Sequence, residues 1–177
     1  MKKVLIIIVA IVLSTCCVQA QSIKQAMMSK TQGVGQSSVQ YVDLGLSVKW
    51  ATCNVGAGKP WEYGGYFTFE EAQKQGQVPT KEEFQELLDK CTWQWTTLNG
   101  INGYRVTARN GNSIFLPAAG NRDGTDVYGV GSGGSYWSSS ASSDYYYAYC
   151  LYFYYDDAYV YFNGRHYGQS VRLVRGS

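Results

Sequence analysis

The chain has 177 residues, which is enough for one domain with a sizeable core and short for two. Charged residues make up 16% of it and 20 residues are glycine, a composition that argues against disorder and favours a turn-rich fold. The net charge of +2, without any run of Lys or Arg, excludes a strongly basic nucleic-acid-binding surface. Aromatic residues reach 15%, the one unusual bulk figure.

Residues 1–20 are predicted to be an export signal. Two lysines precede an apolar run over residues 4–13, and a small-x-small cleavage site ends at Ala20. The apolar run is too short for a stable transmembrane span. A lipoprotein signal is the alternative, in which a lipid on Cys16 or Cys17 would anchor the chain to a membrane. Either interpretation implies an exported protein, secreted or held at the cell surface.

Residues 21–40 are polar and rich in Gln, Ser and Gly, so we expect a flexible linker before a domain at residues 41–175. Three cysteines remain beyond the signal. Their odd number allows at most one internal disulfide, for which Cys53 and Cys91 are the candidates because both lie in scaffold-like segments. Three buried free thiols, Cys150 included, are an equally good interpretation.

The domain is predicted to be α+β, with one helix and short, mostly antiparallel strands. A capping box formed by Thr80 and Glu83 and an apolar stripe after it predict a helix over about residues 80–91. Three Asn-Gly pairs, at 99–100, 102–103 and 110–111, predict tight turns, and residues 120–134 are predicted to be a glycine-dense loop. The segments predicted to be strands are residues 46–50, 66–69, 92–96, 104–107, 113–117, 147–153, 158–162 and 170–174.

Residues 136–167 hold an unusual density of tyrosine: ten of the chain's 16 lie between Tyr145 and Tyr167. A core does not need so many phenols, because each buried hydroxyl must find a hydrogen-bond partner. Tyrosine interleaved with Ser, Gly and Asn is instead typical of antibody-like binding surfaces. From Ser138 to Gly168 there is also no Lys, Glu, Gln, Met or Trp, although all five occur earlier in the chain.

Alternation divides this stretch into scaffold and surface. Tyr149, Leu151 and Phe153 share the better core face of one strand. Val160 and Phe162 are expected to point inward from the next strand. The remaining loop and outward positions are the candidate ligand-binding residues: Asp144, Tyr145, Tyr146, Tyr147, Tyr154, Tyr155, Asp156, Asp157, Tyr159, Tyr161, Asn163, Arg165, His166 and Tyr167.

No constellation of residues indicates catalysis or a metal site. His166 is the sole histidine and has no partner at ligand spacing. Asp156 and Asp157 are adjacent, so on an extended chain their carboxylates point to opposite faces, whereas calcium requires several converging oxygens. The glycines at 129–134 do not follow the strand–helix pattern of a nucleotide site. We therefore expect neither an enzyme nor a cofactor.

Several segments resemble one family of exported domains. Residues 41–51 and 54–57 are similar to the opening of the Fibrobacter succinogenes major paralogous domains, which are common in gut Bacteroidetes and have a C-type-lectin-like fold. Further similar segments follow in consistent order over about residues 41–175: Pro79-Thr80 with the helix, Cys91–Trp93, Leu116–Gly120, Arg122–Gly124, Tyr136–Ser140 and Ser170–Val174. The resemblance implies a C-type-lectin-like fold, which is also that of formylglycine-generating enzymes.

The same layout resembles the target proteins of diversity-generating retroelements. In those proteins, a C-terminal segment of a C-type-lectin fold is rewritten by reverse transcription that misreads template adenines. Diversified AAC codons can become Asn, Tyr, Asp, His, Ser, Ala, Gly, Arg or Cys, among others, but not Lys, Glu, Gln, Met or Trp. Those five residue types are the ones missing from Ser138–Gly168. The resemblance implies a variable binding region at about residues 136–167.

Together these observations predict an exported, non-enzymatic recognition protein whose ligand is a protein or glycan on another cell, a phage or a host surface. Two alternatives remain open. Tyrosine-rich edge strands could instead build a self-associating structural component of the cell surface. A formylglycine-generating-enzyme-like catalyst is the weaker alternative, because that chemistry depends on a cysteine pair in the C-terminal half, where this chain has Cys150 alone.

Overall fold

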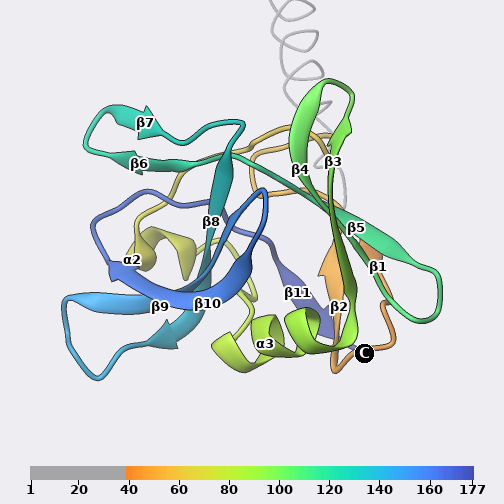
Figure 1. Cartoon of the computed structure of the whole chain (residues 1–177). Helices are drawn as coiled ribbons and strands as arrows, with labels where there is room; N and C mark the ends of the chain where they lie inside the picture. Colours follow the sequence, from red (N-terminus) through yellow and green to blue (C-terminus); the bar gives the residue numbers. More distant parts are fainter. Residues whose placement is uncertain (1–38) are drawn as a thin grey trace, which may run out of the picture. The chain divides into compact units, whose positions relative to one another are not determined.

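The computed structural model describes residues 39–177, drawn in colour in Figure 1. The expected export signal, with Cys16 and Cys17, and all but the last two residues of the expected linker lie outside the described residues. Within the described part the chain is α+β: three three-stranded antiparallel sheets and one two-stranded hairpin are accompanied by two short helices. No helix among these residues is long and apolar enough to cross a membrane.

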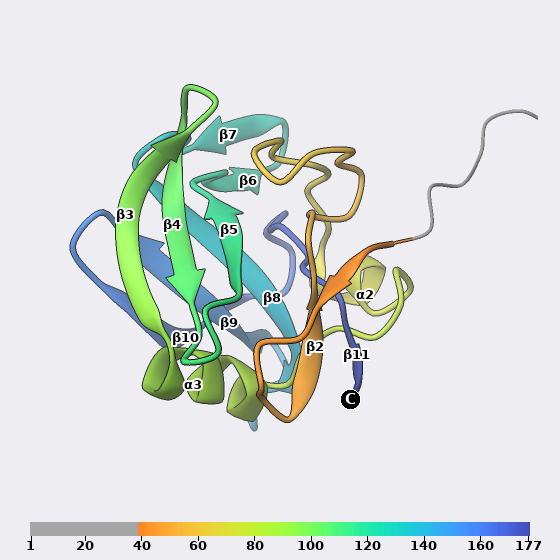
Figure 2. The ribbon, with the colours of Figure 1, turned by 90° about the vertical axis from the view of Figure 1, so that its right-hand side faces the viewer.

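The elements of the described residues are, in chain order, β1 (Tyr41–Val42), β2 (Val48–Ala51), α2 (Phe69–Ala72), α3 (Lys81–Lys90), β3 (Thr92–Leu98), β4 (Ile101–Thr107), β5 (Ser113–Pro117), β6 (Asn121–Asp123), β7 (Asp126–Tyr128), β8 (Gly133–Ala141), β9 (Tyr147–Tyr154), β10 (Ala158–Gly164) and β11 (Val174–Gly176). The sheets have the strand orders β1-β2-β11, β3-β4-β5 and β10-β9-β8, and β6 pairs with β7. Figure 2 shows β11 beside β2, so that the two ends of the domain meet in one sheet.

Helix α3 begins where the sequence predicts. The Thr80 side-chain hydroxyl accepts a hydrogen bond from the backbone N–H of Glu83 at 3.1 Å, and the Glu83 carboxylate accepts one from the backbone N–H of Thr80 at 2.7 Å. Phe84 and Leu87 on its apolar stripe are fully buried. The Phe84 ring lies 5.5 Å from the ring of Trp50 in β2, which joins the helix to the main core.

The serines of β8 hold α3 against the sheet. The backbone N–H of Ser139 donates to the carbonyl of Pro79 at 2.7 Å, and the Ser140 hydroxyl accepts from the backbone N–H of Lys81 at 3.0 Å. The Ser138 hydroxyl donates to the carbonyl of Tyr149 at 2.7 Å. These three serines are therefore scaffold, and they place the start of α3 beside β8, as Figure 1 shows.

The sequence predicts a strand at residues 66–69 and a loop at 120–134, and both predictions are wrong. Thr68 and Glu71 form a second capping box, with hydrogen bonds of 3.4 and 2.9 Å, and start the helix α2. The loop contains the β6–β7 hairpin, whose two strands pair from Asn121↔Tyr128 to Asp123↔Asp126.

The Asn-Gly pairs differ from one another. Asn99 and Gly100 turn between β3 and β4 with positive φ values of 50° and 83°, as the sequence predicts. Asn102 and Gly103, by contrast, lie inside β4 and make no turn. A Cβ at Gly103 would come within 2.3 Å of the carbonyl oxygen of Leu116, so the glycine allows β5 to approach closely.

The last strand begins later in the chain than the sequence predicts, next to a buried arginine. The final strand is Val174–Gly176, not residues 170–174, because Arg172 is drawn fully into the interior. Its guanidinium donates to the side-chain oxygen of Asn54 at 2.9 Å and to the carbonyls of Ala51 and Phe115 at 2.9 and 2.8 Å. Burial lowers the pKa of Arg172, because removal from water disfavours the charged form and none of these hydrogen-bond partners is a carboxylate.

Tyr136 completes this network from β8. It is fully buried, its hydroxyl donates to the carbonyl of Pro117 at 2.7 Å, and it accepts from the side-chain amide of Asn54 at 3.2 Å. Burial raises the pKa of Tyr136 to about 12. The polar network therefore ties β2, β5, β8 and the C-terminal segment together.

The predicted disulfide does not form. Cys53, Cys91 and Cys150 are all free thiols. Strand β2 keeps Cys53 and Cys91 apart: Ser47, before the strand, hydrogen-bonds to Glu86 of α3, near Cys91, whereas Cys53 follows its other end. Four extended residues span roughly 13 Å, well beyond the reach of a disulfide.

Candidate functional site

Strands β9 and β10 carry most of the candidate residues. They pair in continuous register from Phe153↔Ala158 to Tyr147↔Gly164, and β10 is the edge strand of its sheet among the described residues. Side chains alternate between the two faces. We define the tyrosine face as the side of these strands that carries Tyr152, Tyr154, Tyr159 and Tyr161.

The opposite side of β9 faces the core, as the sequence predicts for Leu151 and Phe153, which are fully buried. Val160 packs against the same core, but Phe162 does not, and its prediction as an inward residue is wrong: 46% of it is exposed. Its register partner is Tyr149, toward the end of the sheet, and its ring contacts Tyr147 at 5.7 Å instead of core residues.

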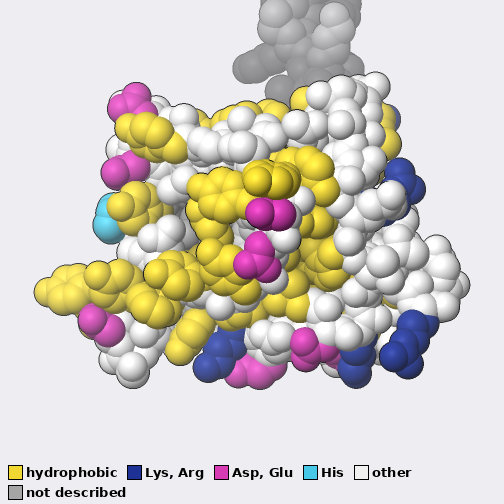
Figure 3. Space-filling view, viewed as in Figure 1, with side chains coloured by type: hydrophobic (Ala, Val, Ile, Leu, Met, Phe, Trp, Pro, Cys, Tyr) yellow, Lys and Arg dark blue, Asp and Glu magenta, His cyan; other side chains and the backbone are white. Residues whose placement is uncertain are grey.

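Exposed tyrosines gather on these strands and their turns, and they form much of the yellow area in Figure 3. Tyr145 and Tyr146 are each 74% exposed and Tyr155 is 64% exposed. Rings on the tyrosine face contact one another: Tyr152 lies 5.3 Å from Tyr154 and 5.7 Å from Tyr159. Burial and the neighbouring Tyr154 raise the pKa of Tyr152.

Several tyrosines of the described residues fall into two groups according to whether the hydroxyl makes a hydrogen bond. Tyr66 donates to the carbonyl of Ala119 at 2.6 Å and Tyr136 to that of Pro117, so both scaffold hydroxyls are satisfied. The surface tyrosines whose hydroxyls hydrogen-bond to no described residue include Tyr145, Tyr146, Tyr147, Tyr155, Tyr159, Tyr161 and Tyr167. A phenol that the fold does not use remains available to a ligand.

Some of the candidate polar residues support the backbone instead. The side-chain oxygens of Asp144, Asp157 and Asn163 accept hydrogen bonds from nearby backbone N–H groups at 3.0, 2.8 and 2.8 Å. These are local turn contacts of the kind that Asp and Asn favour. The Asp156 carboxylate makes neither a hydrogen bond nor an ion pair with a described residue.

Arg165 is likewise part of the scaffold, whereas its neighbour His166 is exposed. The Arg165 guanidinium lies 3.6 Å from the Glu70 carboxylate, and its central carbon lies 4.8 Å from the Phe69 ring centre and 5.1 Å from that of Tyr145. Arg165 therefore ties the residue after β10 to α2.

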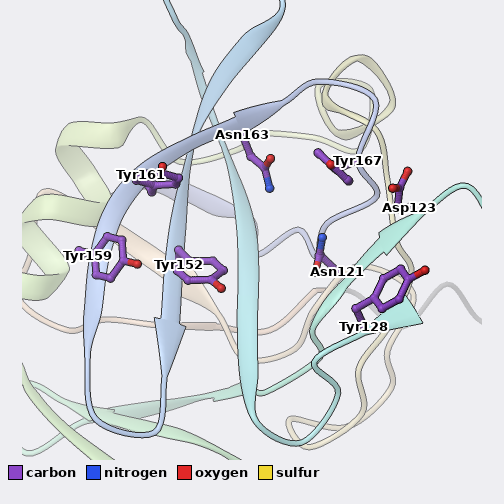
Figure 4. Close-up of a pocket in the computed structure, with 8 residues that line it drawn as sticks. All are labelled: Asn121, Asp123, Tyr128, Tyr152, Tyr159, Tyr161, Asn163 and Tyr167. Carbon is purple, nitrogen blue, oxygen red and sulfur yellow. The ribbon is translucent and has the colours of Figure 1, made fainter. Parts of the chain in front are cut away.

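A cavity of about 470 Å³ opens between the tyrosine face and the β6–β7 hairpin. Figure 4 shows the rings of β9 and β10 on one side and the hairpin residues on the other. We call it the hairpin pocket; its lining residues are Asn121, Asp123, Tyr128, Tyr152, Tyr159, Tyr161, Asn163 and Tyr167. Four of these are candidates from the sequence. Tyr152 and the three hairpin residues are not, although alternation around Asp123-Gly124 could have indicated a hairpin.

A second cavity, of about 420 Å³, lies between α3 and the β9–β10 turn. We call it the helix pocket; its lining residues are Gln85, Leu88, Asp89, Trp93, Tyr104, Asp156, Asp157, Ala158 and Tyr159. Tyr159 thus lines both pockets. Burial raises the pKa of Tyr104, and the charges of Asp156 and Asp157 raise it further.

The described residues contain no group of three or more His, Cys, Asp or Glu side chains that could hold a metal ion. The only candidate nucleophile on β9, Cys150, is fully buried, and burial raises its pKa to about 12.

A protein-family comparison covers this same part of the chain. The Domain of unknown function (DUF8237) matches residues 85–174, just over half of the chain. The chain belongs to this DUF8237 family. The DUF8237 match starts within α3, ends at the first residue of β11, and includes every lining residue of both pockets. No curated protein and no solved structure matches the chain.

Proposed function

We propose that this chain is an exported, non-enzymatic recognition protein that binds a protein or glycan ligand through its tyrosine face and the neighbouring turns. The observation that carries the proposal is the contrast between satisfied scaffold hydroxyls and unbonded surface hydroxyls. Rigid phenol rings lose little conformational entropy on binding and offer both stacking area and a hydrogen-bonding group.

The scaffold of the proposal is C-type-lectin-like. Its support is the resemblance that extends over about residues 41–175, together with the α+β organisation of those residues. Two of the resembling segments, Tyr136–Ser140 and Ser170–Val174, also have scaffold roles, because they contribute Tyr136 and Arg172 to the buried polar network.

The variable region of the proposal, about residues 136–167, is written by a diversity-generating retroelement. The absence of Lys, Glu, Gln, Met and Trp from Ser138–Gly168 supports it. The test is the DNA beside the gene. A near-identical repeat that differs at adenines, next to a reverse-transcriptase gene, is the expected result, and a locus without such a repeat would remove this part of the proposal.

Binding is tested by replacing Tyr154, Tyr155 and Tyr159 together with Ala. These side chains are 43%, 64% and 38% exposed, so we expect the far-ultraviolet circular dichroism to be retained and the melting temperature to change by a few degrees at most. Glycan arrays and peptide-display libraries are then screened with the wild-type protein and with the variant. We expect ligands that the wild type retains and the Ala variant loses.

The corresponding triple Phe variant is the matched control, because it keeps the rings and removes only the hydroxyls. Intermediate binding is expected of it. If the Ala variant unfolds, these tyrosines belong to the core and the proposed site is wrong. If the screens yield no ligand that distinguishes the Ala variant from the wild type, the proposal of binding fails.

Self-association is the second candidate function, and one observation favours it. Edge strand β10 has no strand on its outer side within the described residues, and it exposes Tyr159, Tyr161 and Phe162. Sizing of the protein over a wide concentration range distinguishes the two functions. Assembly that grows with concentration and disappears in the triple Ala variant would favour the structural component, whereas a persistent monomer would exclude it.

A further inference from the structure

The two pockets on either side of Tyr159 share one electrostatic property. The hairpin pocket contains the carboxylate of Asp123, and the helix pocket contains those of Asp89, Asp156 and Asp157. Neither lining includes a Lys, Arg or His side chain. Figure 3 shows carboxylates enclosed by the yellow aromatic area, whereas the dark blue basic side chains lie along the borders of this face.

The basic residues nearest to the hairpin pocket point elsewhere. Arg122 lies between two lining residues of β6, so alternation turns it to the opposite side of the hairpin, where it lies against Gly168. Hydrogen bonds from Thr68 lower the pKa of Glu71, and the charge of Arg122 lowers it further, which places that charge on the α2 side. Arg165 is occupied by Glu70. No cation of the described residues therefore neutralises Asp123.

The protein already pairs cations with aromatic rings on and next to β9. The Lys81 ammonium lies 4.3 Å from the ring centre of Tyr149, and the Arg165 guanidinium lies 5.1 Å from that of Tyr145. An aromatic face attracts a cation through its quadrupole, and guanidinium groups stack on such faces while pairing with carboxylates. In the two pockets the rings and the carboxylates are present without a cation from the described residues.

We propose that the hairpin pocket and the helix pocket each bind the guanidinium of an arginine from a protein partner. This proposal rests on the proposed binding function. Tyr159 stands between the two sites and its ring lines both. Tyr152, Tyr161 and Tyr128 supply aromatic faces to one site. Trp93 supplies one to the other site, where Tyr104 is buried and lines only the wall. The carboxylates of Asp123 and Asp156, which make no hydrogen bond to a described residue, pair with the two guanidinium groups.

The test uses the full-length chain and a synthetic probe, the acetylated and amidated peptide Gly-Arg-Ser-Arg-Gly. Its counterpart with citrulline in place of both arginines keeps the planar shape but lacks the charge, and it carries a carbonyl acceptor in place of one donor nitrogen. Titrations followed by NMR measure both affinities. We expect saturable binding of the arginine peptide. The affinity for the citrulline peptide is expected to be lower by a factor of about ten or more.

Substitutions locate the sites. Asp123→Asn and Asp156→Asn each remove one charge without removing a side-chain hydrogen bond or ion pair within the described residues, and each is expected to lower the affinity for the arginine peptide several-fold. Glu82→Gln is the matched control, because Glu82 is an exposed carboxylate on the first turn of α3 that lies outside the lining of both pockets. It should bind the peptide as the wild type does.

Three results would overturn the inference. They are the absence of saturable binding by the arginine peptide, equal affinity for the citrulline peptide, and unchanged affinity in both pocket variants. Retention of a neutral glycan or an acidic peptide in the screens, through the tyrosine face, would also overturn it while leaving the proposed binding function intact. Failure of the binding function itself would appear separately, as the absence of any ligand sensitive to the triple Ala substitution.

Discussion

Tyr136 and Tyr161 lie on two strands of the same sheet, β8 and β10, yet they have opposite environments. Tyr136 is fully buried and its hydroxyl makes two hydrogen bonds, to Pro117 and Asn54. Tyr161 is 49% exposed and its hydroxyl makes none with the described residues. The difference teaches that the same residue type serves as scaffold on one strand and as surface two strands away, and that the hydroxyl partners of these two tyrosines match their two roles.

The largest loss of stability should follow from replacing Arg172, which shares the partner Asn54 with Tyr136 in the buried polar network. Arg172→Ala leaves the acceptors of three buried hydrogen bonds unpaired and opens a cavity, so we expect it to lower the free energy of unfolding by about 3–5 kcal/mol. Urea denaturation measures the change. Arg175→Ala is the control, since that exposed side chain lies over the Tyr41 ring and should contribute about 1 kcal/mol or less. Equal losses in the two variants would show that the buried network is dispensable.

A pair of hydroxyl deletions tests the comparison directly. Tyr136→Phe leaves the Pro117 carbonyl and the Asn54 amide short of a partner in the interior, which should cost about 1–3 kcal/mol of unfolding free energy. Tyr161→Phe removes an unbonded surface hydroxyl and should change stability by about 0.5 kcal/mol or less. Thermal and urea unfolding of both variants provide the measurement. A Tyr161→Phe loss as large as that of Tyr136→Phe would contradict the division into scaffold and surface.

Local signals in the sequence predict part of this scaffold. Helix α3 follows from residues within one turn of each other, Thr80 and Glu83, and from an apolar stripe with period near 3.6. Thr68 and Glu71 are the same kind of signal for α2, but a four-residue helix has no stripe to support it. The β6–β7 hairpin is hidden for a similar reason, because the glycines of residues 120–134 favour a loop more strongly than three-residue strands favour pairing.

What the sequence does not predict depends on contacts between distant residues. Arg172 is buried because acceptors more than 50 residues earlier in the chain converge on it, and no local pattern indicates this. Alternation assigns Phe162 to the inner face, yet its exposure is set by where the core ends along β10. The hairpin pocket combines Asp123 with Tyr161 from another sheet, so its composition follows from packing. The tyrosine-rich segment itself is evident from composition alone.

The smallest predicted effect concerns Cys150, which lies opposite Tyr161 in the sheet and marks the boundary between the buried and exposed regions. Burial raises its pKa from 9.0 to about 12, so an unfolded chain releases this proton at lower pH than the folded protein does. The contribution of the protonated Cys150 thiol to the free energy of unfolding is therefore complete below pH 9 and is lost as the pH rises toward 12. The loss is on the order of 1 kcal/mol by pH 10.

Urea unfolding of the wild type and of Cys150→Ala at pH 7 and pH 10 isolates this contribution, because the cavity that the variant creates destabilises the protein equally at both pH values. We expect the wild type to lose more stability than the variant between the two. Identical losses would mean that solvent reaches the Cys150 thiol in the folded protein.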